Sequence, residues 1–240
     1  MKSIESKLIK AIRTYGLIDD GDKILIGLSG GKDSLALVEL LSERAQIFSP
    51  KFSLMAAHIS LENSPYQSDI DYLSDFTKAH NVPFLHQVTS FDAQQDTRKS
   101  PCFLCSWTRR KALFELSKEH GCNKIAFGHH QDDMLETLLM NQIFQGSFGT
   151  MPPKLKMDKF DMTIIRPLAL IREADLAQMA LERNYKKQLK NCPFEKESFR
   201  PHVRHILEEM EEMNPNATSS LWNCMTHVQP TYLPSPLEKP

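Results

Sequence analysis

A glycine turn flanked by polar side chains lies near the N-terminus and has the composition of a phosphate-binding loop. Its six residues are Ser29, Gly30, Gly31, Lys32, Asp33 and Ser34. Paired glycines let the backbone turn sharply with its amides outward, and the following helix adds partial positive charge, so phosphate is the expected ligand. A Walker A loop needs Gly at position 26 and Ser or Thr at 33, where this chain has Ile26 and Asp33, which indicates a different phosphate cradle. A purely structural turn is the alternative.

Three of the five cysteines have the spacing of metal ligands. Cys102 and Cys105 form a Cys-x-x-Cys pair between a loop and a helix expected from residue 107, where the helix N-terminus stabilises thiolates. Cys192, in a break after a helical segment, is the best third ligand, whereas Cys122 and Cys224 have the helix-end setting of buried cysteines. Three thiolates without an obvious fourth ligand suit a [4Fe-4S] cluster with one open iron. Zinc and a redox dithiol are the alternatives.

Charged side chains also follow another predicted strand. Gly128 starts a Gly-His-His-Gln-Asp-Asp segment that ends with Asp132 and Asp133. Asp132 and Glu136 are four residues apart and share a helix face, where a carboxylate can bind Mg²⁺ or orient a substrate; helix capping is the alternative. Arg109 lies one turn beyond the Cys-x-x-Cys pair and can hold a phosphate group there, as Arg110 and Arg166 also can.

Strands and helices alternate along the chain in the order that builds a parallel sheet. The predicted strands are residues 23–28, 52–59, 83–88, 124–127 and 163–167. The predicted helices are residues 1–16, 33–45, 69–80, 107–120, 132–144, 202–213 and 219–228. This order predicts an α/β fold of Rossmann-like type, a parallel sheet with helices on both faces. Loops that begin at residues 29, 60, 90 and 128 then meet at the carboxyl edge, where such sheets bind ligands.

Length and composition predict one main domain, residues 1–200, and a smaller helical segment with a Pro-rich tail, residues 201–240. A net charge of −1 gives no support to a broad nucleic-acid-binding face, although basic clusters exist. No window is long and apolar enough for a membrane helix, and the N-terminus does not read as a signal peptide, so we expect a cytoplasmic protein with no membrane partner. The amphipathic terminal helices make a homodimer plausible.

Residues 29–34 resemble the PP-loop of the N-type ATP pyrophosphatases, which cleave ATP between its α and β phosphates to adenylate a substrate. The resemblance implies that this loop binds the β and γ phosphates, that Lys32 steadies the leaving pyrophosphate, and that His58 and Ile59 lie beside adenine.

The wider order of motifs resembles the TtcA family over nearly the whole chain. It includes the loop, the Cys-x-x-Cys pair, residues 128–137, Met-Pro-Pro-Lys-Leu at 151–155, Ile-Arg-Pro-Leu at 165–168 and Cys192. The family implies synthesis of 2-thiocytidine in tRNA with ATP, magnesium and a [4Fe-4S] cluster held by three cysteines. Its second Cys-x-x-Cys stands here as Cys-Pro-Phe-Glu, so only Cys192 remains as a ligand, and Glu195 either approaches the open iron or faces solvent.

The expected reaction is adenylation of the C2 oxygen of a cytidine in the anticodon loop, followed by attack of sulfur on C2. Sulfur would come from a cysteine desulfurase or from free sulfide. The alternatives are thiolation of another tRNA position or of a small heterocycle by the same chemistry, and a nucleotide- and metal-binding regulator without turnover.

Overall fold

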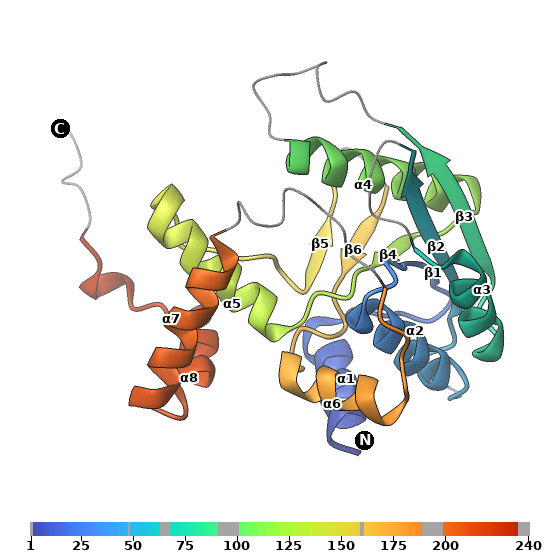
Figure 1. Cartoon of the computed structure of the whole chain (residues 1–240). Coiled ribbons are helices and arrows are strands. Elements are labelled where there is room, and N and C mark those ends of the chain that lie inside the picture. The colour runs from blue at the N-terminus through green and yellow to red at the C-terminus, as the bar shows by residue number, and fades with distance from the viewer. Residues whose placement is uncertain are drawn as a thin grey trace. The chain divides into compact units, whose positions relative to one another are not determined.

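A six-stranded sheet forms the centre of the fold (Figure 1). The computed structural model describes residues 2–47, 49–62, 68–90, 101–158, 161–188 and 199–234. The strand order is β3-β2-β1-β4-β6-β5, and every neighbouring pair is parallel except β5 and β6. The strands are β1 (Lys23–Gly27), β2 (Ser53–Leu61), β3 (Phe84–Thr89), β4 (Lys124–Ala126), β5 (Lys154–Lys156) and β6 (Thr163–Ile165). The predicted α/β class is confirmed.

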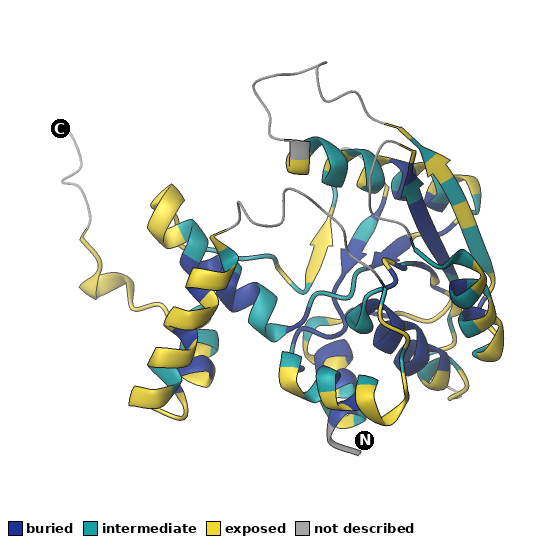
Figure 2. Cartoon of the chain, viewed as in Figure 1, coloured by how far each residue is buried: buried dark blue, intermediate teal, exposed yellow. Residues whose placement is uncertain are grey.

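Side chains of β1 alternate between two apolar cores, one on each face of the sheet. Ile24 and Ile26 point into the larger core, which helices α1, α2, α3 and α6 complete, and Leu25 points into a second core with α4. The helices are α1 (Lys2–Tyr15), α2 (Lys32–Ala45), α3 (Ile70–Ala79), α4 (Pro101–Glu119) and α6 (Glu173–Glu182). Figure 2 shows the inner strands buried, as a sheet covered on both faces requires.

Helix α4 begins at Pro101, six residues before the expected start at 107. Proline is well suited to the first helical position because the amide that it lacks would have no partner there. The sequence interpretation placed the Cys-x-x-Cys pair between a loop and a helix that starts at residue 107, and the structure corrects the helix start: both cysteines lie in its first turns. Two further elements, β5 and α6, were not among the predicted strands and helices.

The chain divides into two compact units, Met1–Met134 with Pro152–Ser198, and Leu135–Met151 with Phe199–Pro240. The second unit thus contains residues 135–151, which the expected boundary at residue 200 assigns to the first. Helix α5 (Gln131–Met140) starts in the first unit and continues into the second. A π-helical turn η1 (Asn141–Gln145), α7 (Arg200–Met213), α8 (Ala217–Cys224) and a short η3 (Pro230–Tyr232) follow in the second unit.

The second unit has its own small core and a buried charge. Leu135 and Leu139 of α5 pack against Val203 and Leu207 of α7. Glu136 is fully buried, and its carboxylate accepts hydrogen bonds from two arginines of α7, Arg200 at 3.2 Å and Arg204 at 2.9 Å. This carboxylate therefore ties α5 to α7. No helix among the described residues combines the length and apolar character needed to cross a membrane.

Candidate active site at the carboxyl edge of the sheet

The phosphate loop joins β1 to α2 and is held by its own hydroxyl groups. Gly30 has φ +84°, a left-handed conformation that glycine adopts without strain. The Ser29 hydroxyl accepts a hydrogen bond from the Gly31 amide at 3.3 Å and lies 3.1 Å from the hydroxyl of Ser34, which donates to the Gly31 carbonyl at 2.9 Å. The first amides of α2 have no partner within the helix, so they and its dipole face the loop. The geometry suits an anion.

The loop after β4 approaches this phosphate loop so closely that a side chain at Gly128 would press on the backbone of the loop. A Cβ atom added to Gly128 would lie 3.1 Å from the carbonyl carbon and oxygen of Asp33 and from the amide nitrogen of Ser34. These are backbone atoms, which cannot turn aside as a side chain would. Two of the four loops expected to meet at the carboxyl edge, those that begin at residues 29 and 128, are therefore in contact.

Lys32 is held between two carboxylates at the mouth of the loop. Its ammonium lies 3.1 Å from Asp33 and 3.0 Å from Glu173, the first residue of α6. Burial lowers the pKa of Lys32, but the two carboxylates outweigh it and the net pKa is raised. The lysine is thus firmly cationic, as a residue that binds phosphate must be.

Asp132 fixes the start of α6 beside the loop. One carboxylate oxygen accepts from Nε of Arg172 at 2.8 Å, and the other accepts from the backbone amide of Glu173 at 2.6 Å. Burial alone would raise the pKa of Asp132, but hydrogen bonds from His130 and Glu173 and the charge of Arg172 lower it to about 2. Asp132 therefore positions Glu173, the residue that pairs with Lys32.

His130 is buried among the acidic residues of the same segment. Its ring nitrogens lie 3.6 Å from Asp132 and 3.5 Å from Asp133, and its backbone amide donates to Asp133 at 3.1 Å. Burial lowers the pKa of His130, yet the charges of Asp132, Asp133 and Asp33 raise it overall. The neighbouring acids thus favour the protonated form of this imidazole, and the backbone amide of Asp133 points at Nδ1 from 3.4 Å.

His58 and Ile59, expected beside adenine, are both buried in β2. Nδ1 of His58 lies 2.7 Å from the carbonyl oxygen of Leu28, at the end of β1. Burial lowers the pKa of His58 to about 4, and the charges of Arg109 and His86 act in the same direction. His58 is thus neutral at pH 7 and donates from Nδ1 to the backbone.

Helix α4 carries a cysteine pair and an arginine on one face. Cys102, Cys105 and Arg109 are spaced i, i+3 and i+7, which places them along one stripe. Cys102 is exposed and Cys105 half-buried. Parallel crossovers start at the carboxyl edge, so these first turns of α4 lie at the same edge as the phosphate loop. Arg109 is close enough to His58 for its charge to lower the pKa of that histidine.

Part of the expected metal centre falls beyond the residues with a described structure. Cys192 and Glu195 belong to the segment 189–198, which is not described. In the described part of the chain, no three His, Cys, Asp or Glu side chains gather closely enough to bind a metal ion. Two exposed or half-buried thiols on a helix N-terminus have the donor chemistry that a cluster or zinc requires, and a third ligand must come from elsewhere.

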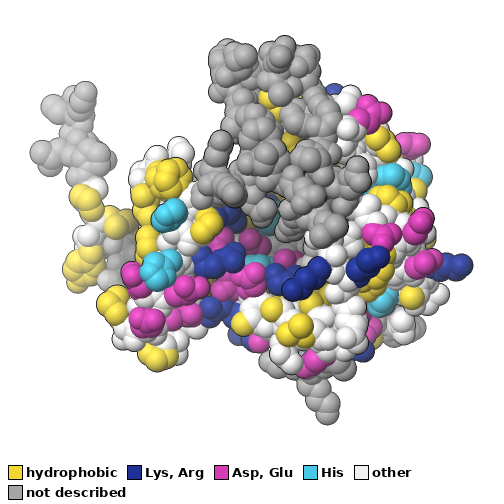
Figure 3. All heavy atoms as spheres, in the orientation of Figure 1, with side chains coloured by type: hydrophobic (Ala, Val, Ile, Leu, Met, Phe, Trp, Pro, Cys, Tyr) yellow, Lys and Arg dark blue, Asp and Glu magenta, His cyan; other side chains and the backbone are white. Residues whose placement is uncertain are grey.

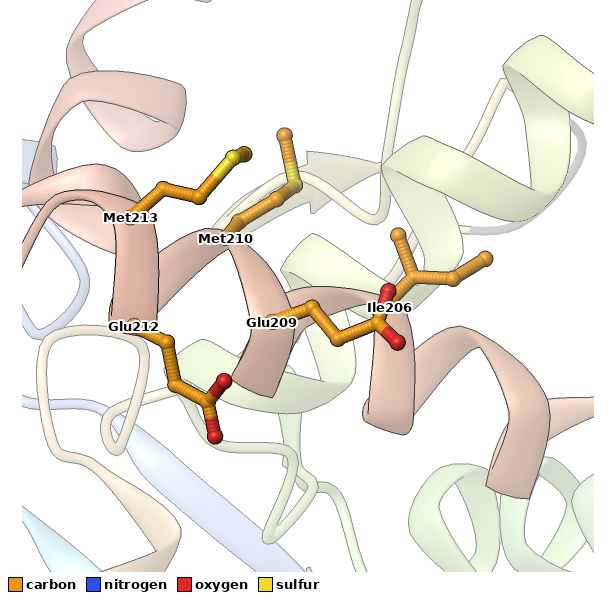
Figure 4. A pocket seen from close by; sticks show the side chains of 5 residues that line it. All are labelled: Ile206, Glu209, Met210, Glu212 and Met213. Atoms are coloured by element: carbon orange, nitrogen blue, oxygen red, sulfur yellow. The ribbon is translucent and has the colours of Figure 1, made fainter.

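The surface of the described residues carries both signs of charge (Figure 3) and a hollow that none of the expected site residues lines. On the face in Figure 3, Lys and Arg side chains lie beside Asp and Glu, as the net charge of −1 leads one to expect. A shallow hollow in the second unit is lined by side chains of α7 (Figure 4), namely Ile206, Glu209, Met210, Glu212 and Met213. None of these residues is an expected site residue.

Two residues of the edge, Arg172 and Glu173, were not singled out from the sequence. Both follow β6 closely, so the rule that ligands bind at the carboxyl ends of parallel strands could have identified them. Their contacts with Asp132 and Lys32 span about 40 and 141 positions and leave no local signal.

The fold and the loop define an α/β nucleotide-binding protein of the PP-loop class, and the PP-loop domain family model matches residues 1–210. The chain is 34% identical over 239 residues to the tRNA-cytidine(32) 2-sulfurtransferase of Geobacter sulfurreducens, covering 97% of this chain and 92% of the relative. It is 35% identical over 237 residues to that of Chromohalobacter salexigens, covering 97% and 83%. The chain belongs to this family of tRNA-cytidine(32) 2-sulfurtransferases, the TtcA family.

A solved structure supports the same relationship. The U34-tRNA thiolase NcsA from Methanococcus maripaludis, determined with its [4Fe-4S] cluster, matches with a TM-score of 0.77 at 28% identity, over 95% of this chain and 80% of that one. An NH3-dependent NAD synthetase from Campylobacter jejuni shares the fold alone, with a TM-score of 0.50 and 16% identity.

Proposed function

We propose that this chain is an ATP-dependent tRNA sulfurtransferase that replaces the C2 oxygen of cytidine 32 with sulfur in the cytoplasm. The observation that carries the proposal is the meeting of three elements at one sheet edge: the phosphate loop, the acidic segment after Gly128 and the cysteine end of α4. The curated relatives carry the name of this activity, and they match the chain over nearly its whole length.

ATP binds with its β and γ phosphates in the loop of residues 29–34 and its adenine beside His58 and Ile59. Lys32 leaves Glu173 and neutralises the pyrophosphate as the α–β bond breaks. Asp33, Asp132 and Asp133 are the carboxylates around the loop that would hold Mg²⁺, and the ion would supply further positive charge beside the phosphates. Arg109 steadies the α phosphate when the C2 oxygen of the base attacks it.

The reaction balances in two displacements. The C2 oxygen displaces pyrophosphate from ATP, which gives an O-adenylated base. Sulfur at the sulfide level then attacks C2, and AMP leaves with the original oxygen. The products are 2-thiocytidine, AMP and pyrophosphate, with no net oxidation. The base must be unstacked to expose C2, which a nucleotide of a single-stranded loop permits.

Cys102, Cys105 and Cys192 are the ligands that we assign to a [4Fe-4S] cluster. Held by these three cysteines, such a cluster would supply a site for the incoming sulfur. The stripe of Cys102, Cys105 and Arg109 on α4 favours this assignment because Arg109, at one end of the stripe, lies close enough to His58 for its charge to lower the pKa of that histidine. The sulfur comes from a cysteine desulfurase or from free sulfide. The working form is a homodimer.

The test is reconstitution under anaerobic conditions with ATP, Mg²⁺, sulfide and tRNA that lacks thionucleosides. We expect 2-thiocytidine by mass spectrometry of digested tRNA, with AMP and pyrophosphate formed in equal amounts. Lys32→Ala should abolish formation of 2-thiocytidine and release of AMP and pyrophosphate. Cys224→Ala, which changes a cysteine outside the site, should leave all three unchanged. A thiouridine product would show that the acceptor is another tRNA position. Pyrophosphate release without any thionucleoside would favour a small heterocycle as the acceptor.

A further inference from the structure

Arg166 is a buried, positively charged side chain. It follows β6 directly, at the carboxyl edge of the sheet, and its side chain is only 6% exposed. One guanidinium nitrogen donates to the Pro152 carbonyl at 2.6 Å, while Nε is buried without a hydrogen-bond partner. Among the residues with a described structure, no Asp or Glu forms an ion pair with Arg166. An arginine keeps its charge, so such burial is costly unless an anion completes it.

A second arginine adds to this positive charge. Arg110 of α4 is exposed, and its charge, after burial as the larger cause, helps to lower the pKa of Arg166 to about 10. No described Asp or Glu forms an ion pair with Arg110 either. Two arginines that approach each other without an acid between them repel, and a shared phosphate would turn the repulsion into attraction.

We infer that Arg166 and Arg110 form a phosphate-binding subsite for a backbone phosphodiester next to the target nucleotide of tRNA; this inference rests on the proposed function. The strand order favours an RNA phosphate over a phosphate of ATP as the ligand of this subsite. Adenine is assigned to the end of β2 and the phosphate loop to the end of β1, whereas Arg166 follows β6, which is separated from β1 by β4. Two strand spacings amount to about 10 Å, on the side of the loop away from adenine. The acceptor must approach from that side.

This subsite would fix the position of the RNA without reading its sequence. Phosphate contacts set the register of a nucleic acid on a protein, and base contacts provide the specificity. One phosphate held beside the cysteine end of α4 fixes where the neighbouring base can lie. The subsite also gives an RNA substrate a local basic anchor in a chain whose net charge is −1.

The experiment compares binding of tRNA and of ATP by the full-length chain. Arg110→Gln and Arg166→Met should each weaken tRNA binding about tenfold at moderate salt. Each should also reduce the slope of log affinity against log salt by about 0.7, the value for one phosphate of a single strand. ATP binding should be unchanged, which also shows that the variants are folded. If both arginines share one phosphate, the double variant should bind tRNA only slightly less tightly than the single variant with the lower tRNA affinity.

Lys118→Gln is the matched control because Lys118 is an exposed basic residue in the last turn of α4, about two helical turns beyond Arg110. It should bind tRNA like the unaltered chain. Weaker ATP binding with unchanged tRNA binding would overturn the inference and assign the α phosphate of ATP to these arginines. Unchanged binding of both ligands would also overturn it. If Arg166→Met does not fold, Arg110→Gln decides alone.

The two proposals fail in different ways. Thiolation of tRNA by the unaltered chain, together with normal tRNA binding by Arg110→Gln, overturns the subsite and leaves the proposed function intact. Absence of both tRNA binding and thiolation in the unaltered chain overturns the two together.

Discussion

The ammonium of Lys32 lies 3.0 Å from the carboxylate of Glu173, so an acid of α6 sits where a nucleotide phosphate would place its charge. Both side chains are about one-third exposed, and the contact is open to exchange with an incoming anion. Glu173 thus competes with phosphate for the loop lysine. Asp132 keeps it in place through the first amide of α6.

Glu173→Gln should strengthen binding of pyrophosphate in the absence of Mg²⁺. The substitution removes a negative charge beside the phosphates and frees Lys32, and for a partly exposed pair the gain is about three- to fivefold in affinity. Isothermal titration calorimetry measures it. Glu182→Gln, at the exposed end of the same helix, is the control. Weaker binding in Glu173→Gln would show that this carboxylate does not oppose the anion.

Gly128→Ala should weaken ATP binding at least about tenfold and destabilise the fold by about 1–3 kcal/mol, because the added methyl group presses on the backbone of Asp33 and Ser34. Fluorescence titration with a nucleotide analogue and thermal unfolding measure the two effects. Gly149→Ala, where a Cβ meets no atom within 4 Å, should change neither. Normal nucleotide binding by Gly128→Ala would mean that the two loops need not touch.

Asp132→Asn should lower stability at pH 7 by about 2 kcal/mol. The pKa of Asp132 is about 2 in the folded chain against an ordinary value of 3.8. Its stabilisation is therefore present above pH 4 and is lost as the pH falls through 2. Urea unfolding of both proteins between pH 7 and pH 3 should show the difference shrink on the acid side. Asp161→Asn, at an exposed position, is the control. A stability difference between Asp132→Asn and the unaltered chain that stays constant with pH would contradict the assigned pKa.

Alanine at Cys102, Cys105 or Cys192 should each abolish iron binding after anaerobic purification and eliminate 2-thiocytidine. Iron and sulfide assays, with absorbance near about 400 nm, measure the cluster directly. Cys122→Ala and Cys224→Ala should retain iron, because Cys122 lies in an apolar core and the Cys224 thiol donates to the Leu221 carbonyl. If the unaltered protein contains one zinc ion and no iron, the metal centre is a zinc site and the cluster assignment is wrong.

The central fold could be predicted because its signals are local. Residues 23–27 form a continuous apolar strand between a turn and a glycine loop, and the predicted and observed bounds differ by one residue. Strand β5 gave no such signal, since its Lys-Leu-Lys sequence is exposed and pairs only with β6. The start of α4 was missed because apolar periodicity begins at residue 107, whereas the proline at 101 already permits a helix.

Residues of the candidate site that are adjacent in the sequence could likewise be predicted, whereas contacts between distant residues could not. Adjacent residues such as Gly30, Gly31 and Lys32 identify the loop, because a phosphate cradle is built from consecutive backbone amides. Glu136 shows the limit of local spacing. It shares a helix face with Asp132, yet its partners are arginines 64 and 68 positions away, which only the folded chain brings together. The expectation that either acid binds Mg²⁺ stays a prediction, whereas the contacts of Glu136 are those of a structural residue.

Because Cys102 and Cys105 lie inside α4, the helix holds this pair of proposed cluster ligands in place before any metal binds. Main-chain hydrogen bonds of the helix, and not an ion, set the spacing of these two sulfurs. After a chelator has removed the metal, the chain should therefore keep the two cysteines at the same spacing. Small zinc modules, by contrast, unfold when their metal is removed. If Cys192 is the third ligand, as proposed, reloading would have to add only its sulfur to a pair that the helix has already positioned.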